Sequence, residues 1–279
     1  MDLLICGSAA SEAIPAFFCI CPVCVKANKL KGKDMRSRVA YQLGDTVRVD
    51  FGPDILMHQF KYDLHYEKLR HLFITHSHRD HFYPLALGYR MEGFSYVEAD
   101  NIMNFYGNST VLNMLNDAFK YLKTDFEKCR INPVQLRSGI PVEMSAEKMT
   151  LVPLPANHAL SEEAFIFAIK KNEKQILIGN DSAYFQEETW NSLHDFKFNI
   201  VILDDTGCGL DISVNGGHTG GKFVLDTVTR MRNEGMADEM TVFIVNHFSH
   251  NGRMNHRELE KYFNPHGVQV AFDGMAVPV

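Results

Sequence analysis

Three histidines and one aspartate fall within a single short run of the sequence, His76-Ser77-His78-Arg79-Asp80-His81. Four such side chains packed together would crowd and desolvate one another, and a divalent metal is the simplest compensation. The alternative, ordinary hydrogen-bonded histidines after a strand, leaves the crowding unexplained. The spacing also suits a turn that directs two ligands toward each of two adjacent ions. We therefore predict a dinuclear metal site and a hydrolytic reaction, because two ions make hydroxide available from a shared water near neutral pH.

A second concentration of ligand-type residues is the run Cys19-Ile20-Cys21-Pro22-Val23-Cys24. Three thiolates are one ligand short of a tetrahedral zinc site, and in a reducing compartment such a cluster binds metal more readily than it forms disulfides. One alternative is buried reduced cysteines, which the Cys-Pro-x-Cys turn disfavours. Another is a zinc ribbon that binds a macromolecule, which the lack of a second cysteine pair weakens. On the residues alone, the fourth ligand is Cys6, Cys208 or a distant histidine.

Short apolar strands must position these residues. The clearest expected strands are 47–50, 71–74, 149–152, 175–178, 199–203 and 241–245, and each is followed within a few residues by Asp or His. A site built along one edge of packed sheets requires this arrangement. Helical spacing predicts helices over 111–123 and 220–233, and a third after Asn255 as its N-cap. We interpret residues 91–149, which hold no ligand of the main cluster, as an insertion that shapes the substrate entrance.

Composition and charge fit one domain covering residues 1–279. A chain of 279 residues, 46% of them hydrophobic, can bury one substantial core, and no linker divides it. The net charge of −6, with both signs mixed along the chain, gives no positive field for a nucleic-acid backbone. The run Met1–Cys6 lacks a signal peptide's basic start, and no apolar stretch approaches the ~20 residues of a membrane span. We expect a cytoplasmic protein with no nucleic-acid or membrane partner, and keep a homodimer open as its assembly.

The run from His76 to His81 resembles the His-x-His-x-Asp-His motif of the metallo-β-lactamase superfamily, and that family's later motifs appear in order. The matching residues are Asp50 in Val-Asp-Phe-Gly, His158 in Pro-Ala-Asn-His, Asp181 in Gly-Asn-Asp-Ser and His247 in Val-Asn-His-Phe. Each alone is more typical of a turn or capping aspartate or a hydrogen-bonded histidine, but their common position after apolar strands, in the expected order, favours a shared site. The resemblance spans nearly the whole chain. It implies a four-layer αββα fold, in which two packed mixed β-sheets are flanked by helices.

Carried over position by position, the resemblance implies two groups of ligands joined by one bridging carboxylate. One ion would be held by His76, His78 and His158, the other by Asp80, His81 and His247, with Asp181 between them. Asp50 would orient a ligand or the hydroxide from outside. Mixed imidazole and carboxylate ligands suit Zn, Mn or Fe, and the family's habit points to Mn or Zn.

The cysteine run resembles a narrower group, the PhnP-like phosphodiesterases of phosphonate metabolism, which carry a structural zinc on a Cys-x-Cys-x-x-Cys insert. In that group the fourth ligand is a histidine three residues after the last active-site histidine, and His250 in His247-Phe248-Ser249-His250 matches it. The implied structural zinc ligands are Cys19, Cys21, Cys24 and His250. One loop would then serve both metal sites.

The same resemblance implies a histidine that protonates the leaving oxygen, and His218 in Asn-Gly-Gly-His-Thr-Gly is the candidate. A histidine on a Gly-rich loop can approach substrate and titrates in the useful range. The alternative is a loop histidine without a role, and the flanking residues do not copy the group closely. The loop Gly7–Glu12 also departs from the group's more Gly-rich form by placing an acidic side chain where an anionic substrate passes.

We therefore predict a metal-dependent phosphodiesterase that hydrolyses a small or cyclic phosphodiester, with Asp80 and His218 as its catalytic residues. Metal-activated hydroxide would attack phosphorus in line, and His218 would protonate the departing alkoxide. One rival is a tRNA 3′-processing endonuclease, which needs an RNA-binding surface. Another is a lactone or thioester hydrolase, which would not use His218 in this way. The complete ligand set argues against a non-catalytic metal-binding protein.

Overall fold

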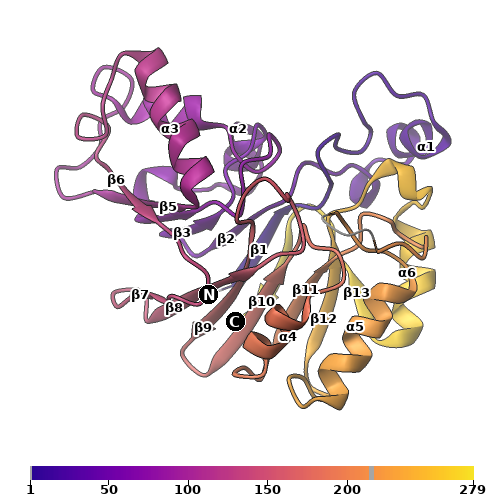
Figure 1. Ribbon diagram of the computed structural model, residues 1–279. Coiled ribbons are helices and arrows are strands. Elements are labelled where there is room, and N and C mark those ends of the chain that lie inside the picture. The colour runs from indigo at the N-terminus through magenta and orange to yellow at the C-terminus, as the bar shows by residue number, and fades with distance from the viewer. Residues whose placement is uncertain (1, 214–216) are drawn as a thin grey trace.

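Two mixed β-sheets of seven strands each pack together in the computed structural model, which describes residues 2–213 and 217–279. Helices cover the outer sides of this pair: Figure 1 shows α3 beside the first sheet and α5 and α6 beside the second. The four-layer αββα arrangement predicted from the sequence is confirmed.

Neighbouring strands in each sheet do not always follow one another along the chain. In spatial order, the first sheet contains β14 (Met275–Pro278), β1 (Asp2–Gly7), β2 (Ala40–Leu43), β3 (Val47–Val49), β4 (His71–Phe73), β5 (Met103–Gly107) and β6 (Ile131–Gln135). The second sheet contains β13 (Val268–Val270), β12 (Val242–Asn246), β11 (Ile200–Asp204), β10 (Lys174–Gly179), β9 (Phe165–Lys171), β8 (Met149–Pro155) and β7 (Val142–Met144). The α-helices are α1 (Pro22–Leu30), α2 (Ile55–Tyr62), α3 (Ser109–Leu122), α4 (Glu187–Leu193), α5 (Lys222–Asn233) and α6 (His256–Phe263).

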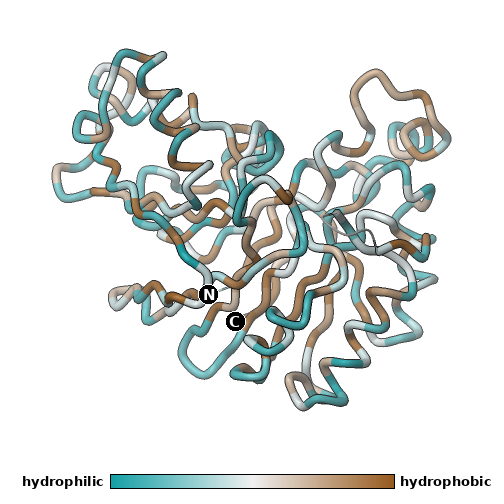
Figure 2. Tube along the Cα trace, in the orientation of Figure 1, coloured by the Kyte–Doolittle hydropathy of each residue, from teal (hydrophilic) through white to brown (hydrophobic). Residues whose placement is uncertain are grey.

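The main apolar core lies between the two sheets. Phe73 of β4 and Phe167 of β9 are both fully buried, and their rings meet edge to face with centroids 6.0 Å apart. A second apolar cluster lies on the other side of the first sheet, where Leu115 and Phe119 of α3 pack with Phe105 of β5. In Figure 2 the brown, apolar segments accordingly follow the strands, and the teal segments follow the outer loops and helices.

The strands and helices predicted from periodicity are present. The expected strands correspond to β3, β4, β8, β10, β11 and β12, and the expected helices to α3, α5 and α6. β11 is buried at every position and pairs in parallel with β10 and β12, which explains its continuous apolar run. At the start of α6, Asn255 and Glu258 exchange side-chain to backbone hydrogen bonds, the capping box that fixes the helix there.

The interpretation of residues 91–149 as an insertion is wrong. This segment supplies β5 and β6, which extend the first sheet in parallel beyond β4, and β7, which ends the second sheet. It also supplies α3. The strands were hard to recognise because β6, Ile-Asn-Pro-Val-Gln, mixes polar residues and proline into a half-buried edge.

The ends of the parallel strands determine where the candidate site lies. β3 and β4 are parallel in the first sheet, and β10, β11 and β12 are parallel in the second, so the residues that follow them leave each sheet at one edge. None of the helices in the described ranges has both the length and the apolar character that crossing a membrane requires.

Candidate active site

The run from His76 to His81 forms a turn that follows β4. The backbone N–H of His81 donates to the carbonyl oxygen of His78 at 3.0 Å and closes the turn. His76 and His81 are buried, whereas His78 is exposed. The turn sends His76 and His78 toward one group of ligand-type atoms, and Asp80 and His81 toward a second.

The first group consists of His76, His78 and His158, with one ring nitrogen from each lying within 4.8 Å of the others. His158 comes from the loop after β8. Its Nε2 lies 3.1 Å from Nδ1 of His78, and its Nδ1 lies 3.0 Å from the carbonyl oxygen of Gly217. Since a carbonyl only accepts, Nδ1 carries the proton, and Nε2 keeps a lone pair directed at the group.

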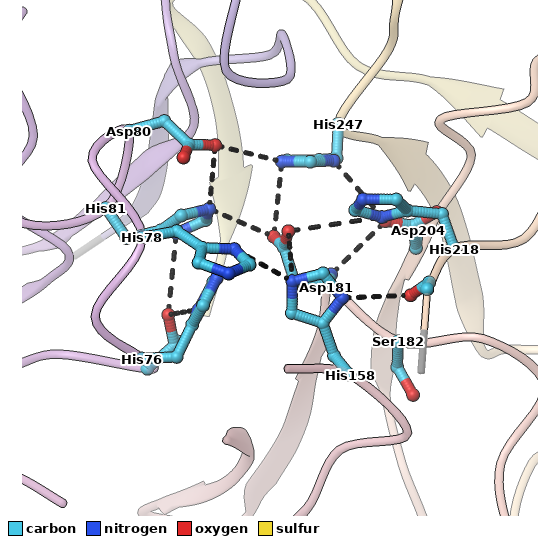
Figure 3. Close-up of polar contacts among 12 residues, drawn as sticks. His76, His78, Asp80, His81, His158, Asp181, Ser182, Asp204, His218 and His247 are labelled. Carbon is cyan, nitrogen blue, oxygen red and sulfur yellow. Dashed lines mark hydrogen bonds and ion pairs between the residues drawn. The ribbon is translucent and has the colours of Figure 1, made fainter. Parts of the chain in front are cut away.

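The second group consists of Asp80, His81, Asp181 and His247. Asp181 follows β10, and its Oδ2 lies 3.2 Å from Nε2 of His81 and 3.2 Å from Nε2 of His247. Its other oxygen, Oδ1, lies 3.7 Å from Nε2 of His158 in the first group. Asp181 therefore lies between the two groups, in the middle of the side chains in Figure 3.

Several of these buried atoms make no hydrogen bond to any described residue, although His81, His247 and Asp181 form the ion-pair contacts given above. They are Nε2 of His76, Nε2 of His81, Nε2 of His247 and Oδ2 of Asp181. An unsatisfied buried polar atom costs about 1–3 kcal/mol, and four of them converging on one place need a common partner. The set of imidazole nitrogens and carboxylate oxygens therefore fits divalent cations.

Asp50 orients the second group from outside. Its Oδ2 lies 2.7 Å from Nδ1 of His81, and its carboxylate also accepts from the backbone N–H and hydroxyl of Thr75. His81 must therefore point its Nε2 toward Asp80 and Asp181. Asp50 has a left-handed backbone (φ 63°), as do Asp181 (52°) and His247 (65°). Such strain at three strand ends is typical of functional sites.

His218 reaches this region through Asp204, the last residue of β11. Nδ1 of His218 lies 3.0 Å from Oδ2 of Asp204, and the same oxygen lies 3.3 Å from Nδ1 of His247. The carboxylate of Asp204 also accepts from the backbone N–H groups of Thr206 and Thr219. Asp204 thus holds the rings of His218 and His247 through one carboxylate. Residues 214–216, in the loop before His218, lie outside the described residues.

Charge in this cluster is strongly coupled. Burial lowers the pKa of His247, but the carboxylates of Asp181, Asp204 and Asp80 together outweigh it and raise the pKa to about 10. Burial opposes ionisation of Asp181 too, yet the imidazoles of His247 and His81 hold its pKa well below the ordinary value. In His76, burial and the neighbouring His81 lower the pKa well below its usual range. A cation would therefore have to displace a proton from His247 but not from His76, since only neutral imidazole is a ligand.

The four residues predicted to hold a structural zinc also meet. Sγ of Cys19 and Sγ of Cys21 each lie 3.4 Å from Nδ1 of His250, and Cys24 completes the group. Each of the three sulfurs also accepts a hydrogen bond from a backbone N–H group. The N–H of Cys21 donates to Sγ of Cys19 at 3.4 Å, that of Cys24 to Sγ of Cys21 at 3.5 Å, and that of Ala16 to Sγ of Cys24 at 3.2 Å. Three thiols and one imidazole with this support fit a tetrahedral zinc site.

A cleft of about 380 Å³ opens over the main cluster. Among the residues that line it are the candidate ligands His78 and Asp181 and the hydroxyl of Ser249. Three further ionisable residues in the lining, Glu12, Arg79 and His218, belong to neither ligand group. It is large enough for a small molecule, and its lining is mostly polar.

Sequence reasoning missed two carboxylates of the site, Asp204 and Glu162. Glu162 accepts from the backbone N–H of Ser77 at 3.1 Å and from its hydroxyl at 2.6 Å, so it supports the turn between His76 and His78. For Asp204 a signal was present, because it follows a predicted strand directly. Glu162 lies in a loop with no local signal.

Comparison with known families gives one match. The model of the beta-lactamase superfamily domain matches residues 45–255 of the chain. No curated protein matches the sequence.

Several solved structures are similar along the whole chain. A diphosphatase from the PhnP family has a TM-score of 0.74 at 21% identity, covering 100% of this chain and 97% of its own. Zinc-bound PqqB from Methylobacterium extorquens has a TM-score of 0.74 at 15% identity, covering 100% of both chains. The short form of human tRNase Z has a TM-score of 0.64 at 16% identity and also covers 100% of both. At these identities the likeness shows a shared fold, while the activities remain those of the other proteins.

Proposed function

The chain belongs to the beta-lactamase superfamily, and on this premise we propose that it is a metal-dependent phosphodiesterase acting on a small or cyclic phosphodiester. The observation that carries the proposal is the pair of ligand groups with Asp181 between them, whose buried imidazole Nε2 atoms make no hydrogen bond to the described residues. Two divalent ions, Mn or Zn, would supply hydroxide near neutral pH and offset negative charge on the phosphoryl group.

The protein's own residues would hold the metal ions, orient the ligand histidines and protonate the leaving oxygen. His76, His78 and His158 form one set of ligands, and Asp80, His81 and His247 form the other. Asp50 and Asp204 hold the Nδ1 side of His81 and His247, so that each presents Nε2. A structural zinc on Cys19, Cys21, Cys24 and His250 would fix the loop that carries His247.

His218 is the proposed proton donor to the leaving oxygen. It lines the cleft, and its Nδ1 is engaged by Asp204, so its Nε2 is the nitrogen that can serve substrate. A hydrolase acting on a lactone or thioester would have less need of this donor. Arg79 lines the same cleft, and a guanidinium there favours an anionic substrate. The similar fold of a PhnP-family diphosphatase supports a phosphoryl substrate as well.

Metal-quantified protein assayed on an aryl phosphodiester, an aryl phosphomonoester, a lactone and a thioester tests the proposal. We expect the diester to be the best substrate. His218→Ala should lower kcat by roughly 10²–10⁴-fold while the bound metal stays constant, since general acid catalysis contributes about that much. Asp80→Ala, in contrast, should abolish turnover through loss of a metal ligand. Full activity of His218→Ala would remove His218 from the mechanism, and preference for the lactone or thioester would overturn the proposed function.

A further inference from the structure

Glu12 is a carboxylate in the wall of the catalytic cleft that is not a member of either metal-ligand group. It lies in the loop between β1 and α1, and it lines the cleft together with His78, Arg79 and His218. Its side chain is 31% exposed, so it faces both the protein and the cleft.

One hydrogen bond and one ion-pair contact hold this carboxylate in place. The buried hydroxyl of Ser249 donates to Oε1 of Glu12. That hydroxyl oxygen already accepts from the backbone N–H of Asn251 at 3.1 Å, so its one proton is free for Glu12. Nε2 of His250 lies 3.6 Å from the same Oε1. Glu12 therefore contacts the loop that carries both His247 and His250.

The two residues before Glu12 are also hydrogen-bonded to other segments of the chain. The backbone N–H of Ala10 donates to the carbonyl of Phe248 at 2.9 Å, and Nε of Arg38 donates to the carbonyl of Ser11 at 2.7 Å. Glu12 is thus a fixed negative group at the cleft, unlike a mobile surface acid.

A fixed negative charge at this place bears on which phosphate esters enter. A phosphodiester carries a single negative charge, whereas a phosphomonoester carries about −1.5 to −2 at pH 7. Two divalent ions and Arg79 would by themselves attract the more highly charged monoester, because Coulomb attraction grows with charge.

We infer that Glu12 is a specificity-determining residue that disfavours dianionic phosphomonoesters and so selects singly charged phosphodiesters. The inference rests on the proposed phosphodiesterase function and names the charge class of its substrates. One oxygen of Glu12 is bound by Ser249, and the remaining carboxylate charge repels a second negative charge on the substrate.

The test uses two probes that differ by one methyl group and one ionisation, p-nitrophenyl methyl phosphate and p-nitrophenyl phosphate, at pH 8. Glu12→Gln keeps the oxygen that accepts from Ser249 and removes the charge. We expect the ratio of diester to monoester kcat/KM to fall roughly fivefold, as expected for one like charge at the rim of a partly hydrated site. The control Glu173→Gln removes an equal charge from an exposed turn and should leave the ratio unchanged.

Glu12→Asp separates charge from structure, since it keeps the charge and shortens the side chain. A purely structural role would lower melting temperature and metal content in both variants and leave the substrate ratio alone. An unchanged ratio in Glu12→Gln would overturn the inference.

Binding of inorganic phosphate and of dimethyl phosphate to the metal-loaded protein, measured by calorimetry, gives a second readout. Glu12→Gln should tighten inorganic phosphate more than dimethyl phosphate, because the carboxylate repels the more highly charged ligand more strongly. This arm reports on Glu12 even if wild-type protein hydrolyses no phosphate ester, which would defeat the proposed function alone. Equal changes for both ligands would also overturn the inference.

Discussion

Asp204 connects the proposed proton donor to a proposed metal ligand. Asp204→Asn keeps the size of the side chain but removes the charge that fixes the rings of His218 and His247. We expect kcat to fall about 10–100-fold, the usual effect of removing a carboxylate that orients a ligand histidine. Steady-state kinetics on an aryl phosphodiester, with bound metal quantified in parallel, measures this effect.

Asp226→Asn is the matched control for Asp204→Asn, because Asp226 is exposed on α5 and away from both ligand groups. It should leave kcat unchanged. If Asp204→Asn retained wild-type kcat and metal content, the link between the two histidines would have no part in the reaction.

At the residue scale, the sequence predicted the candidate ligands, both those crowded between His76 and His81 and those carried by later motifs, but it missed the supporting carboxylates Asp204 and Glu162. The turn from His76 to His81 could be recognised because its side chains are neighbours in sequence. Asp204 could not be distinguished from Asp205, because both carboxylates directly follow the predicted strand 199–203 and the local sequence does not say which of them faces the histidines. Folding sets Asp204 against the histidines, and buries Asp205 with no hydrogen-bond partner for its carboxylate oxygens among the described residues.

At the element scale, the N-terminal end of α3 supports the turn from His76 to His81. The N-cap residue Asn108 accepts from the backbone N–H of Val111, and its side-chain amide donates to Glu162 at 2.7 Å. Glu162 in turn holds Ser77. Asn108→Ala should therefore cost about 1 kcal/mol of unfolding free energy through the lost cap, and should also weaken metal binding at His76 and His78. Chemical denaturation and metal titration measure the two effects.

Asn255→Ala offers a comparison of like with like. Asn255 caps α6 in the same way, but its bonds run to Glu258 of its own helix. The stability cost should be similar, and metal affinity at the histidine groups should not change. Equal losses of affinity in the two variants would mean that helix stability, and not the contact with Glu162, controls the turn.

Helices and strands could be predicted where burial produces a recognisable pattern of apolar residues. β11 and β12 lie inside parallel pairings, so their apolar runs are continuous and easy to identify. β5 and β6 were not expected, because part of each strand is polar, and they depend on pairing with β4 and with each other. Their stability comes from neighbours far away in sequence, which local patterns do not report.

At the scale of the whole molecule, the candidate site exists only when both sheets are packed. The turn from His76 to His81 and Asp50 follow strands of the first sheet, whereas His158, Asp181 and His247 follow strands of the second. Metal binding is therefore coupled to folding, since the unfolded chain brings none of these groups together. The order of the motifs along the chain could be read from the sequence, but the place where their side chains come together could be seen only in the folded structure.

The cysteine cluster extends this coupling, because His247 and His250 share one loop while the cysteines come from the other end of the chain. Cys21→Ser removes one thiolate but leaves an oxygen that can still accept from the backbone N–H of Cys24 and cap α1. We expect one metal fewer per chain and a melting temperature lower by roughly 5–10 °C, because a ligand that binds only the folded state no longer contributes. Metal quantification and calorimetry measure both.

Cys129→Ser provides the contrast, since Cys129 is a buried thiol in the apolar cluster beneath α3 and lies outside the metal groups. It should lower the melting temperature through a buried hydroxyl and leave the metal count unchanged. If Cys21→Ser kept the full metal count, or if Cys19, Cys21 and Cys24 of the native protein were freely alkylated, the cluster would hold no zinc. The N-terminal segment and the C-terminal part of the chain would then be joined here by other contacts, such as the hydrogen bond from Ser249 to Glu12 and the ion pair of Lys26 with Glu258.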